Sequence, residues 1–351
     1  MLKISRTATC WLVFCGSIAI AEESANVIDL IAFGACVHQD KPAPAFDAIA
    51  DLVPDLFVML GDNIYGDTED MAVLKEKYQR MAARSGFQRV RKVCPILATW
   101  DDHDYGLNDG GSGYAKRDES QQVFADIFEL PEDSPVRRRS GVYDVYTYGP
   151  PEKRLQLILL DTRYFRSALK KRPEPGNLYD GSSGPYQPNP DPNATMLGET
   201  QWKWLAKQFR KPAKLRVVVS SIQVVSPHHG WEKWMNMPRE TERLYGLIRD
   251  TRAGGVVFLS GDRHHAEISR NDDTGVGYPL YDITVGSMTH GRKWANEINP
   301  YRLGAMYNDE NFGALTIDWL KPDPLISLQI RDPQGKLLLR HQFPLSSISP
   351  K

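Results

Sequence analysis

The chain has 351 residues, of which 41% are hydrophobic and 25% are charged, and its formal net charge at pH 7 is −1. These proportions are typical of a soluble globular protein with a sizeable core. The conspicuous basic runs, Arg137–Arg139 and Lys170–Arg172, lie in loop-like surroundings. They are more typical of solvated loop charge than of a nucleic-acid-binding patch, so nucleic acid is not expected as a partner.

Residues 1–21 have the pattern of a secretory signal peptide. Lys3 and Arg6 precede a short apolar run, and small residues at Ala19–Ala21 provide the cleavage spacing. The run is too short to be a transmembrane span. We therefore expect cleavage after Ala21 and a secreted or periplasmic mature chain that has no transmembrane segment.

Cleavage would remove Cys10 and Cys15 and leave Cys36 and Cys94. Two cysteines in an oxidising compartment can form a disulfide, although Cys36 has a competing use as a metal ligand. A lipid anchor at Cys15 is an alternative to the cleaved signal peptide. The bulky Phe14 before it disfavours that alternative.

The N-terminal half of the mature chain alternates short apolar runs with helical patterns. The predicted strands are residues 27–33, 56–60, 95–100, 141–149 and 154–161, and the predicted helices lie near 43–52, 70–84 and 118–129. Strands this apolar, separated by helices, indicate a buried and largely parallel sheet with helices on its faces.

Residues 173–198 are rich in Pro, Gly, Asn and Asp, which predicts a long loop. The pattern then predicts helices at 199–210 and 239–251 and strands at 215–221, 255–261, 278–286, 313–320, 325–332 and 336–343. The strands of the last hundred residues have an antiparallel character. Together the elements predict an α/β fold with a single domain over residues 22–351, a two-sheet β-sandwich flanked by helices.

Four predicted strands end in residues that can bind metal ions. The endings are Gly34-Ala35-Cys36, Gly61-Asp62-Asn63-Ile64-Tyr65, Asp101-Asp102-His103-Asp104 and Gly261-Asp262-Arg263-His264-His265. Ligands bind at the carboxyl ends of strands in open α/β sheets. A single Gly-Asp is most often a turn, but four such endings together favour a site.

The ligand types suit two cations of different hardness. Thiolate, phenolate and imidazole favour a transition metal, whereas carboxylates favour a hard divalent ion. A carboxylate has two oxygens, so one shared Asp could bridge the pair. Two adjacent cations form a clamp for in-line displacement at phosphorus.

In this order, the four endings resemble the PhoD-like metallophosphatases, also called the alkaline phosphatase D family, of the calcineurin-like and purple acid phosphatase superfamily. Residues 108–111, 157–167 and 228–240 also resemble that family, and the resemblance spans residues 28–320. It implies the metallophosphoesterase αββα fold. It also implies a secreted, metal-dependent phosphoric ester hydrolase that acts on small phosphate monoesters or diesters.

The resemblance also implies the role of each ligand. Cys36, Tyr65 and His264 would bind Fe3+, and Asp62 would bridge the two ions. The second ion would be held by Asp102 and Asp262, whose carboxylates suit Ca2+.

Three departures from the family pattern bear on these roles. The superfamily's middle histidine has no clean match, so water or Gln223 would complete the coordination. Ala35 replaces the serine that is usual before the cysteine. A disulfide between Cys36 and Cys94 would remove the iron ligand.

As a mechanism, we hypothesise that a hydroxide between the two metals attacks phosphorus opposite the leaving oxygen. His103 is the expected catalytic group at the phosphate or the leaving group, oriented by Asp104 or Asp101. Arg163 is expected to clamp the phosphate, and a structural ion pair is its alternative.

Several other residues are candidates for the rim of the site. His265 and His290 would line it or serve structural roles. The segment Trp231–Met235 and the loop at 173–198 would shape the mouth, although Trp and Met at such spacing are more often packing residues.

Other functions remain as alternatives to an alkaline-phosphatase-type enzyme. One is a phospholipase D-like phosphodiesterase that acts on lipids, and another is a non-catalytic calcium-binding secreted protein. Structural calcium loops gather their ligands within about a dozen residues, which disfavours the second. The sequence has no G-x-S-x-G, Walker or dinucleotide motif, and it does not set the oligomeric state.

Overall fold

The computed structural model describes residues 23–176, 183–293 and 295–350. The predicted signal peptide, residues 1–21, lies outside the described residues, as does part of the 173–198 loop. Among the described residues, no helix combines the length and apolar character needed to cross a membrane.

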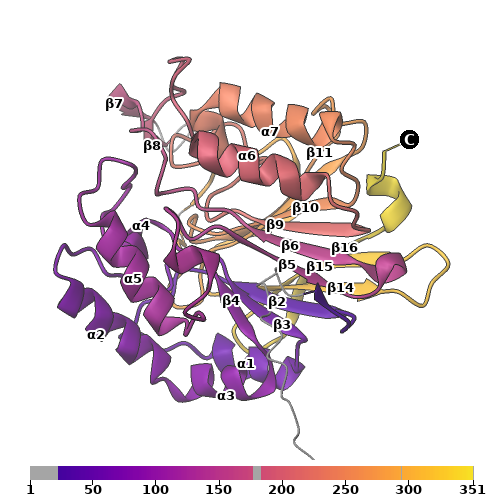
Figure 1. Ribbon diagram of the computed structural model, residues 1–351, viewed down its shortest axis with the longest axis horizontal. Coiled ribbons are helices and arrows are strands. Elements are labelled where there is room, and N and C mark those ends of the chain that lie inside the picture. The colour runs from indigo at the N-terminus through magenta and orange to yellow at the C-terminus, as the bar shows by residue number, and fades with distance from the viewer. Residues whose placement is uncertain (1–22, 177–182, 294, 351) are drawn as a thin grey trace, which may run out of the picture.

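Two large sheets and one two-stranded sheet are formed by the described strands (Figure 1). The eight-stranded sheet has the order β1 (Glu23–Ser24), β5 (Asp144–Tyr148), β6 (Leu155–Leu159), β9 (Leu215–Val219), β10 (Val256–Ser260), β12 (Leu280–Val285), β11 (Ala266–Asn271) and β13 (Arg302–Tyr307). The six-stranded sheet has the order β16 (Leu337–Pro344), β15 (Leu325–Arg331), β14 (Phe312–Asp318), β2 (Leu30–Gly34), β3 (Leu56–Met59) and β4 (Ile96–Ala98). The small sheet pairs β7 (Lys171–Gly176) with β8 (Gly184–Tyr186).

Helices cover the outer face of each large sheet, which gives four layers (Figure 1). Over the eight-stranded sheet lie α6 (Gly198–Phe209) and α7 (Pro238–Asp250). Over the six-stranded sheet lie α1 (Ala45–Leu52), α2 (Met71–Ala82), α3 (Ser85–Val93) and α5 (Arg117–Ile127). The short elements are α4 (Asp102–Tyr105), η1 (Pro135–Arg137), η2 (Pro151–Lys153), η3 (Trp234–Asn236) and η4 (Leu345–Ile348).

Side-chain alternation along the central strands explains why those strands are apolar throughout. In β2, Ile31 faces the other sheet, whereas Ala32 faces the helices. In β3, Val58 likewise faces the other sheet, and Phe57 faces the helices. Successive side chains of a strand point to opposite faces, and here both faces are buried. The predicted two-sheet sandwich flanked by helices is therefore confirmed.

Parallel pairing fixes where the loops meet. In one sheet β2, β3 and β4 run parallel, and in the other β6, β9, β10 and β12 do so. The carboxyl ends of parallel strands share one edge, so the loops that follow them meet at that edge.

The structure adds several elements to those predicted from the sequence. Helix α3 follows α2 where a connection to the next strand was expected. Strand β7 overlaps the start of the predicted 173–198 loop, and β8 lies within that loop. Strands β11 and β13 were also missed. In α3, Phe87 and Val90 supply the buried apolar contacts of a largely polar segment, and β13 is partly exposed along its length. Neither segment therefore buries many apolar residues, which are the main sequence signal of an element.

Candidate metal centre

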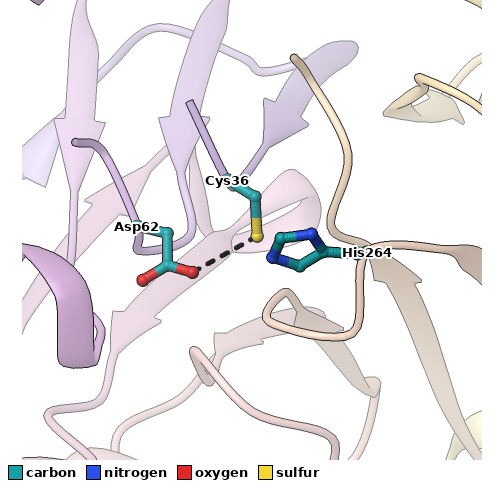
Figure 2. Close-up of side chains that lie close together, drawn as sticks. All are labelled: Cys36, Asp62 and His264. Atoms are coloured by element: carbon teal, nitrogen blue, oxygen red, sulfur yellow. Dashed lines mark hydrogen bonds between the residues drawn. The ribbon is translucent and has the colours of Figure 1, made fainter. Parts of the chain in front are cut away.

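The loops after β2 and β3 place a thiol beside a carboxylate. Cys36 Sγ lies 3.4 Å from Asp62 Oδ2, and both residues are buried (Figure 2). Their φ angles are +58° and +50°, a region that non-glycine residues rarely adopt. Such strain persists where the surrounding structure holds it and is concentrated at functional sites.

The loop after β10 brings two further predicted ligands to the same place. Asp262 and His264 also have positive φ angles, +63° and +53°. Figure 2 shows the imidazole of His264 turned toward Cys36 and Asp62. Tyr65 Oη lies 2.9 Å from His264 Nε2. The residues expected to bind the first ion are therefore brought together.

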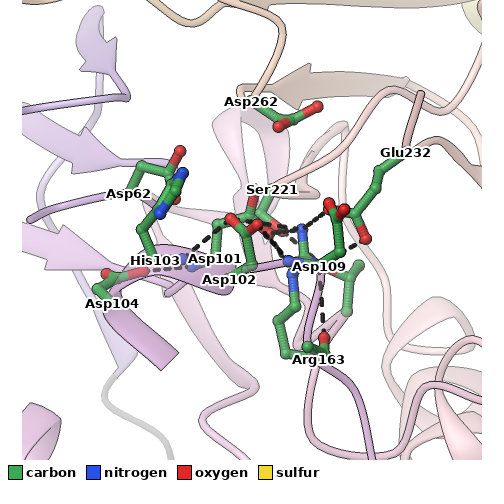
Figure 3. Close-up of polar contacts among 12 residues, drawn as sticks. Asp62, Asp101, Asp102, His103, Asp104, Asp109, Arg163, Ser221, Glu232 and Asp262 are labelled. Carbon is green, nitrogen blue, oxygen red and sulfur yellow. Dashed lines mark hydrogen bonds and ion pairs between the residues drawn. The ribbon is translucent and has the colours of Figure 1, made fainter. Parts of the chain in front are cut away.

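Asp62 connects this group to a second one. Ligand atoms of Cys36, Asp62 and His264 lie within 4.8 Å of one another, and the same is true of Asp62, Asp102 and His103. A further group joins Asp62 to Asp101 and Asp262. Figure 3 shows Asp62 beside the ring of His103, with Asp101 and Asp102 next to them. The predicted bridging position of Asp62 agrees with this arrangement.

The electrostatics of the cluster fit a bound cation. Burial raises the pKa of Asp62 well above its usual value, and neighbouring carboxylates add to the shift. Burial and the charge of Asp62 raise the pKa of the Cys36 thiol. Buried oxygens Asp62 Oδ1 and Asp101 Oδ2 have no hydrogen-bond partner among the described residues. A metal ion would supply the missing partner and offset the repulsion between charged ligands.

Asp104 holds the loops together and does not contact His103 as was expected. Its carboxylate accepts hydrogen bonds from Asn63 Nδ2 at 2.5 Å, from Tyr78 Oη at 3.0 Å and from the backbone N–H of Asp101 at 2.6 Å. These bonds tie α4 to the loop after β3. Burial raises the pKa of Asp104 to about 7.

Asp67, which sequence reasoning missed, is the partner of His103. Nδ1 of His103 lies 2.8 Å and 2.9 Å from the two carboxylate oxygens of Asp67. Burial alone lowers the pKa of His103, but Asp62, Asp102 and Asp67 outweigh burial and raise it to about 11. The expectation that Asp101 or Asp104 orients His103 is therefore corrected.

Arg163 lies in a buried ion-pair network. Its Nε donates to Asp101 Oδ1 at 2.5 Å, and its Nη1 and Nη2 donate to Glu232 at 2.7 and 2.8 Å (Figure 3). The guanidinium is fully buried. Asp101 also accepts from Ser221 Oγ at 2.5 Å. Between the two alternatives for Arg163, these contacts favour the structural ion pair over the phosphate clamp.

The same network reaches Asp102 through backbone contacts. The N–H of Asp109 donates to Asp102 Oδ2 at 2.7 Å, and Arg163 lies 4.0 Å from Asp102 Oδ1. Burial raises the pKa of Asp102, but Arg163 and His103 outweigh it and lower the pKa to about 2. Asp102, Asp109 and Glu232 also form a group with ligand atoms within 4.8 Å.

Two further alternatives from the sequence concern a disulfide at Cys36 and a metal contact by Gln223. Cys36 and Cys94 are both free thiols, so they form no disulfide with each other. Gln223 donates to Glu267 and Thr284 and faces His229, so it is not turned toward the metal ligands.

Of the residues expected at the rim of the site, the structure places some beside the site and others in the core. His265 is fully buried beside Glu267, away from the rim, whereas His290 packs against the ring of His264 with centroids 4.3 Å apart. Trp234 is a core residue, and Trp231 is half-buried.

Comparison with known proteins bears on the family and the fold of this chain. Alkaline phosphatase D of Bacillus subtilis (strain 168) is 24% identical over 247 residues, a match that covers 62% of this chain and 40% of the relative. The chain thus spans less than half the length of that curated relative. A solved structure of PhoD is similar with a TM-score of 0.72, 19% identity and coverage of 94% of this chain and 73% of that one.

A purple acid phosphatase from yellow lupin (Lupinus luteus) seeds has a TM-score of 0.59 at 11% identity, over 92% of this chain and 55% of that one. Both structural likenesses show the fold. A family model described as PhoD-like phosphatase matches residues 31–308, most of the chain. The chain belongs to the PhoD-like phosphatase family.

Proposed function

We propose that this protein is a metal-dependent phosphoric ester hydrolase of the phosphomonoesterase or phosphodiesterase type. The observation that carries the proposal is the shared position of Asp62. Its carboxylate lies within 4.8 Å of the ligand atoms of Cys36 and His264 in one group and of Asp102 and His103 in another. One carboxylate between two ligand groups is what a two-metal centre requires.

The donor types support two different ions. Cys36, Tyr65 and His264 would hold Fe3+ together with Asp62, because thiolate, phenolate and imidazole favour a transition metal. Asp102 and Asp262, each of which lies in a ligand group with Asp62, would hold a harder ion such as Ca2+. Such a pair supplies charge stabilisation at the phosphoryl oxygens and an activated water.

His103 is the proposed proton donor to the leaving oxygen. Asp67 fixes the proton on Nδ1, which leaves Nε2 to face the substrate. Burial lowers the pKa of His103, and the charges of Asp62, Asp102 and Asp67 raise it; the effect of Asp67 does not depend on an empty centre, and it favours the protonated imidazole that a general acid needs.

Arg163 is proposed to act through its neighbours. It holds Asp101 and Glu232 in place and lies close to Asp102, which keeps that carboxylate ionised and ready to bind a cation. Asp104 fixes the backbone of the same turn from its other side.

The test is hydrolysis of aryl phosphate monoesters and diesters by the purified protein, before and after chelation and with His103→Ala. We expect hydrolysis that depends on bound metal. The activity should be lost when the chelator removes the metal ions and should return when the same ions are added back. His103→Ala should keep its metal content and lose most of kcat. A folded protein with no activity on either ester in any metal state would defeat the proposal, and a phospholipid diester in the same panel tests the lipid alternative.

We also propose that residues 1–21 are removed during secretion and that residues 22–351 form the mature domain. The support is the basic and apolar pattern of that segment, which lies outside the described residues. Intact mass measurement of the exported protein tests this, and a retained N-terminus would contradict it.

A further inference from the structure

A cleft lies at the amino ends of two neighbouring strands of the eight-stranded sheet. Strands β9 and β10 run parallel, so the connection from α6 to β9 (residues 210–214) and the connection from α7 to β10 (residues 251–255) meet at one edge. The loop that carries Asp262 and His264 follows the carboxyl end of β10, at the opposite edge. The cleft between the two connections is therefore separate from the candidate metal centre.

The side chains around this cleft carry positive charge and no negative charge. The cleft has a volume of about 450 Å³, and none of the eleven described residues that line it is Asp or Glu. Five of them are cationic: Arg210, Lys211, Lys214, Arg216 and Arg252. The whole chain has a formal net charge of −1, so this concentration does not follow from a generally basic protein.

The exposed cations of the cleft are available to a ligand. Lys214 and Arg252 are exposed, and their side chains form no hydrogen bond or ion pair with another residue that the structure describes. Asp250 is the acid nearest to Arg252 in the sequence, and it pairs with Arg249 at 2.9 Å. No carboxylate therefore neutralises this pair of cations.

Helix ends account for only a small part of the positive charge. Helices α6 and α7 both end beside the cleft, and cations near a helix C-terminus offset its partial negative charge. Arg210 serves this role, because its Nη1 donates to the carbonyl of Ala206 at 3.1 Å. Each C-terminus carries roughly half a negative charge, so the two together offset about one of the cations.

Arg216 adds a buried charge to the wall of the cleft. The residue is 4% exposed, and its guanidinium donates to the carbonyls of Lys211, Ala213 and Gly254 at 2.6, 3.2 and 2.6 Å. In the described parts of the chain no carboxylate pairs with it, and burial lowers its pKa. A buried charge without a counter-charge is costly, so an anion bound in the cleft would stabilise it.

The two connections are locked together before any ligand binds. The carbonyl bonds of Arg216 span both of them, and its backbone N–H donates to the carbonyl of Gly255 at 2.7 Å. Gly255 has a φ of +69°, and a Cβ there would lie 2.1 Å from the carbonyl oxygen of Lys214. Only glycine permits this approach. A wall that is already ordered reduces the entropic cost of binding.

We propose that this cleft is a second anion-binding site, which takes a ligand that carries several phosphate or sulfate groups. Lys214 and Arg252 contact the oxyanions, and Arg216 attracts them from within the wall. Guanidinium and ammonium groups are the side chains that recognise tetrahedral oxyanions. Five cations exceed the charge of one phosphate group, so a polyvalent ligand fits the cleft better. The site does not depend on the proposed hydrolase activity.

Calorimetry with myo-inositol hexasulfate tests the site in the metal-loaded protein. This probe has no phosphoric ester, so the proposed activity cannot consume it. The cleft variant, Lys214→Gln with Arg252→Gln, should bind the probe about 10- to 100-fold more weakly than wild type, the effect of losing charged hydrogen bonds. Its circular dichroism spectrum should be unchanged, because both side chains are exposed.

The matched control is Lys75→Gln with Lys92→Gln. It loses the same two charges at exposed positions of α2 and α3, which cover the other sheet, and it should bind the probe as wild type does. Wild type treated with a chelator should also keep its affinity, because the cleft contains none of the proposed metal ligands.

Vesicles of phosphatidylcholine, with and without phosphatidylglycerol, identify the source of the anion. If phosphatidylglycerol vesicles retain wild type and not the cleft variant, the ligand is a lipid headgroup. If only the hexasulfate binds, the ligand is soluble. Wild-type affinity in the cleft variant, an equal loss in the control variant, or loss of binding after chelation would overturn the proposal. A wild type that binds neither the hexasulfate nor the vesicles would do the same.

Discussion

The imidazole of His103 in helix α4 and the carboxylate of Asp67 in the loop after β3 are paired at 2.8 Å. Asp67 has a φ of +44°, so its backbone is held in an unfavourable conformation where this contact is made. The pair determines which ring nitrogen of His103 faces the substrate and keeps the ring protonated. This is the arrangement expected of a histidine that donates a proton.

Asp67→Asn should lower kcat by about 10- to 100-fold while the metal content stays the same, because Asp67 positions His103 and binds no ion in the proposed centre. Removing the carboxylate also lowers the pKa of His103, so the alkaline limb of the pH–rate profile should move to lower pH. Stopped-time assays across pH, with elemental analysis, measure both effects. An unchanged pH profile would show that the pair is only structural.

Arg163→Met should destabilise the fold by roughly 3–5 kcal/mol, because it leaves the buried carboxylates of Asp101 and Glu232 without a counter-charge. Urea denaturation of the metal-free protein measures this cost. Arg89→Met is the control, since Arg89 forms exposed pairs with Asp47 and Asp51, and should cost less than about 1 kcal/mol. Equal costs for the two variants would contradict the role assigned to the buried network.

The ionisation of Glu267 should make the free energy of unfolding depend on pH in the acid range. Burial alone raises the pKa of Glu267, but His265 and Arg302 outweigh burial and lower it from 4.5 to about 2. A depressed pKa means that the stabilisation is present above pH 4.5 and is lost as pH falls toward 2. The shift corresponds to about 3 kcal/mol.

The measurement is the free energy of unfolding of wild type and Glu267→Gln between pH 7 and pH 2. The difference between them should be largest at neutral pH and should shrink as Glu267 of wild type becomes protonated. A difference that stays constant across this range would exclude the proposed linkage.

Tyr65→Phe tests the identity of the first ion. A phenolate bound to Fe3+ absorbs visible light, so iron-loaded wild type should be coloured and Tyr65→Phe should lose that band. Tyr65 Oη lies 2.9 Å from Nε2 of His264, a proposed ligand of the same ion. Iron-loaded protein whose visible spectrum is unaffected by the substitution would remove Tyr65 from the ligand set.

The sequence indicated which residues meet at the candidate site better than it indicated the contacts that support them. A glycine stands directly before Asp62 and Asp262 and two positions before Cys36, which indicated residues turned toward one sheet edge, and parallel strands bring such ends together. This reasoning needs only local patterns and the order of the strands. The two-sheet fold was predictable for the same reason, because both faces of the central strands are apolar.

The supporting contacts join residues far apart in the sequence. Asp67 and His103 are 36 positions apart, and Arg163 and Glu232 are 69 apart. Asp104 is adjacent to His103 in the sequence, but the turn of α4 directs its carboxylate to Asn63 and Tyr78. Sequence proximity therefore suggested the wrong partner, and only the packing of the loops reveals the right one.

The most direct test of the account is the metal content of Asp62→Asn measured by elemental analysis beside wild type and Asp67→Asn. If Asp62 joins the two halves of the centre, wild type and Asp67→Asn should each bind two ions per chain, and Asp62→Asn should lose both kinds together. An Asp62→Asn protein that is folded and retains both ions at wild-type stoichiometry would contradict the shared carboxylate on which the proposed function depends.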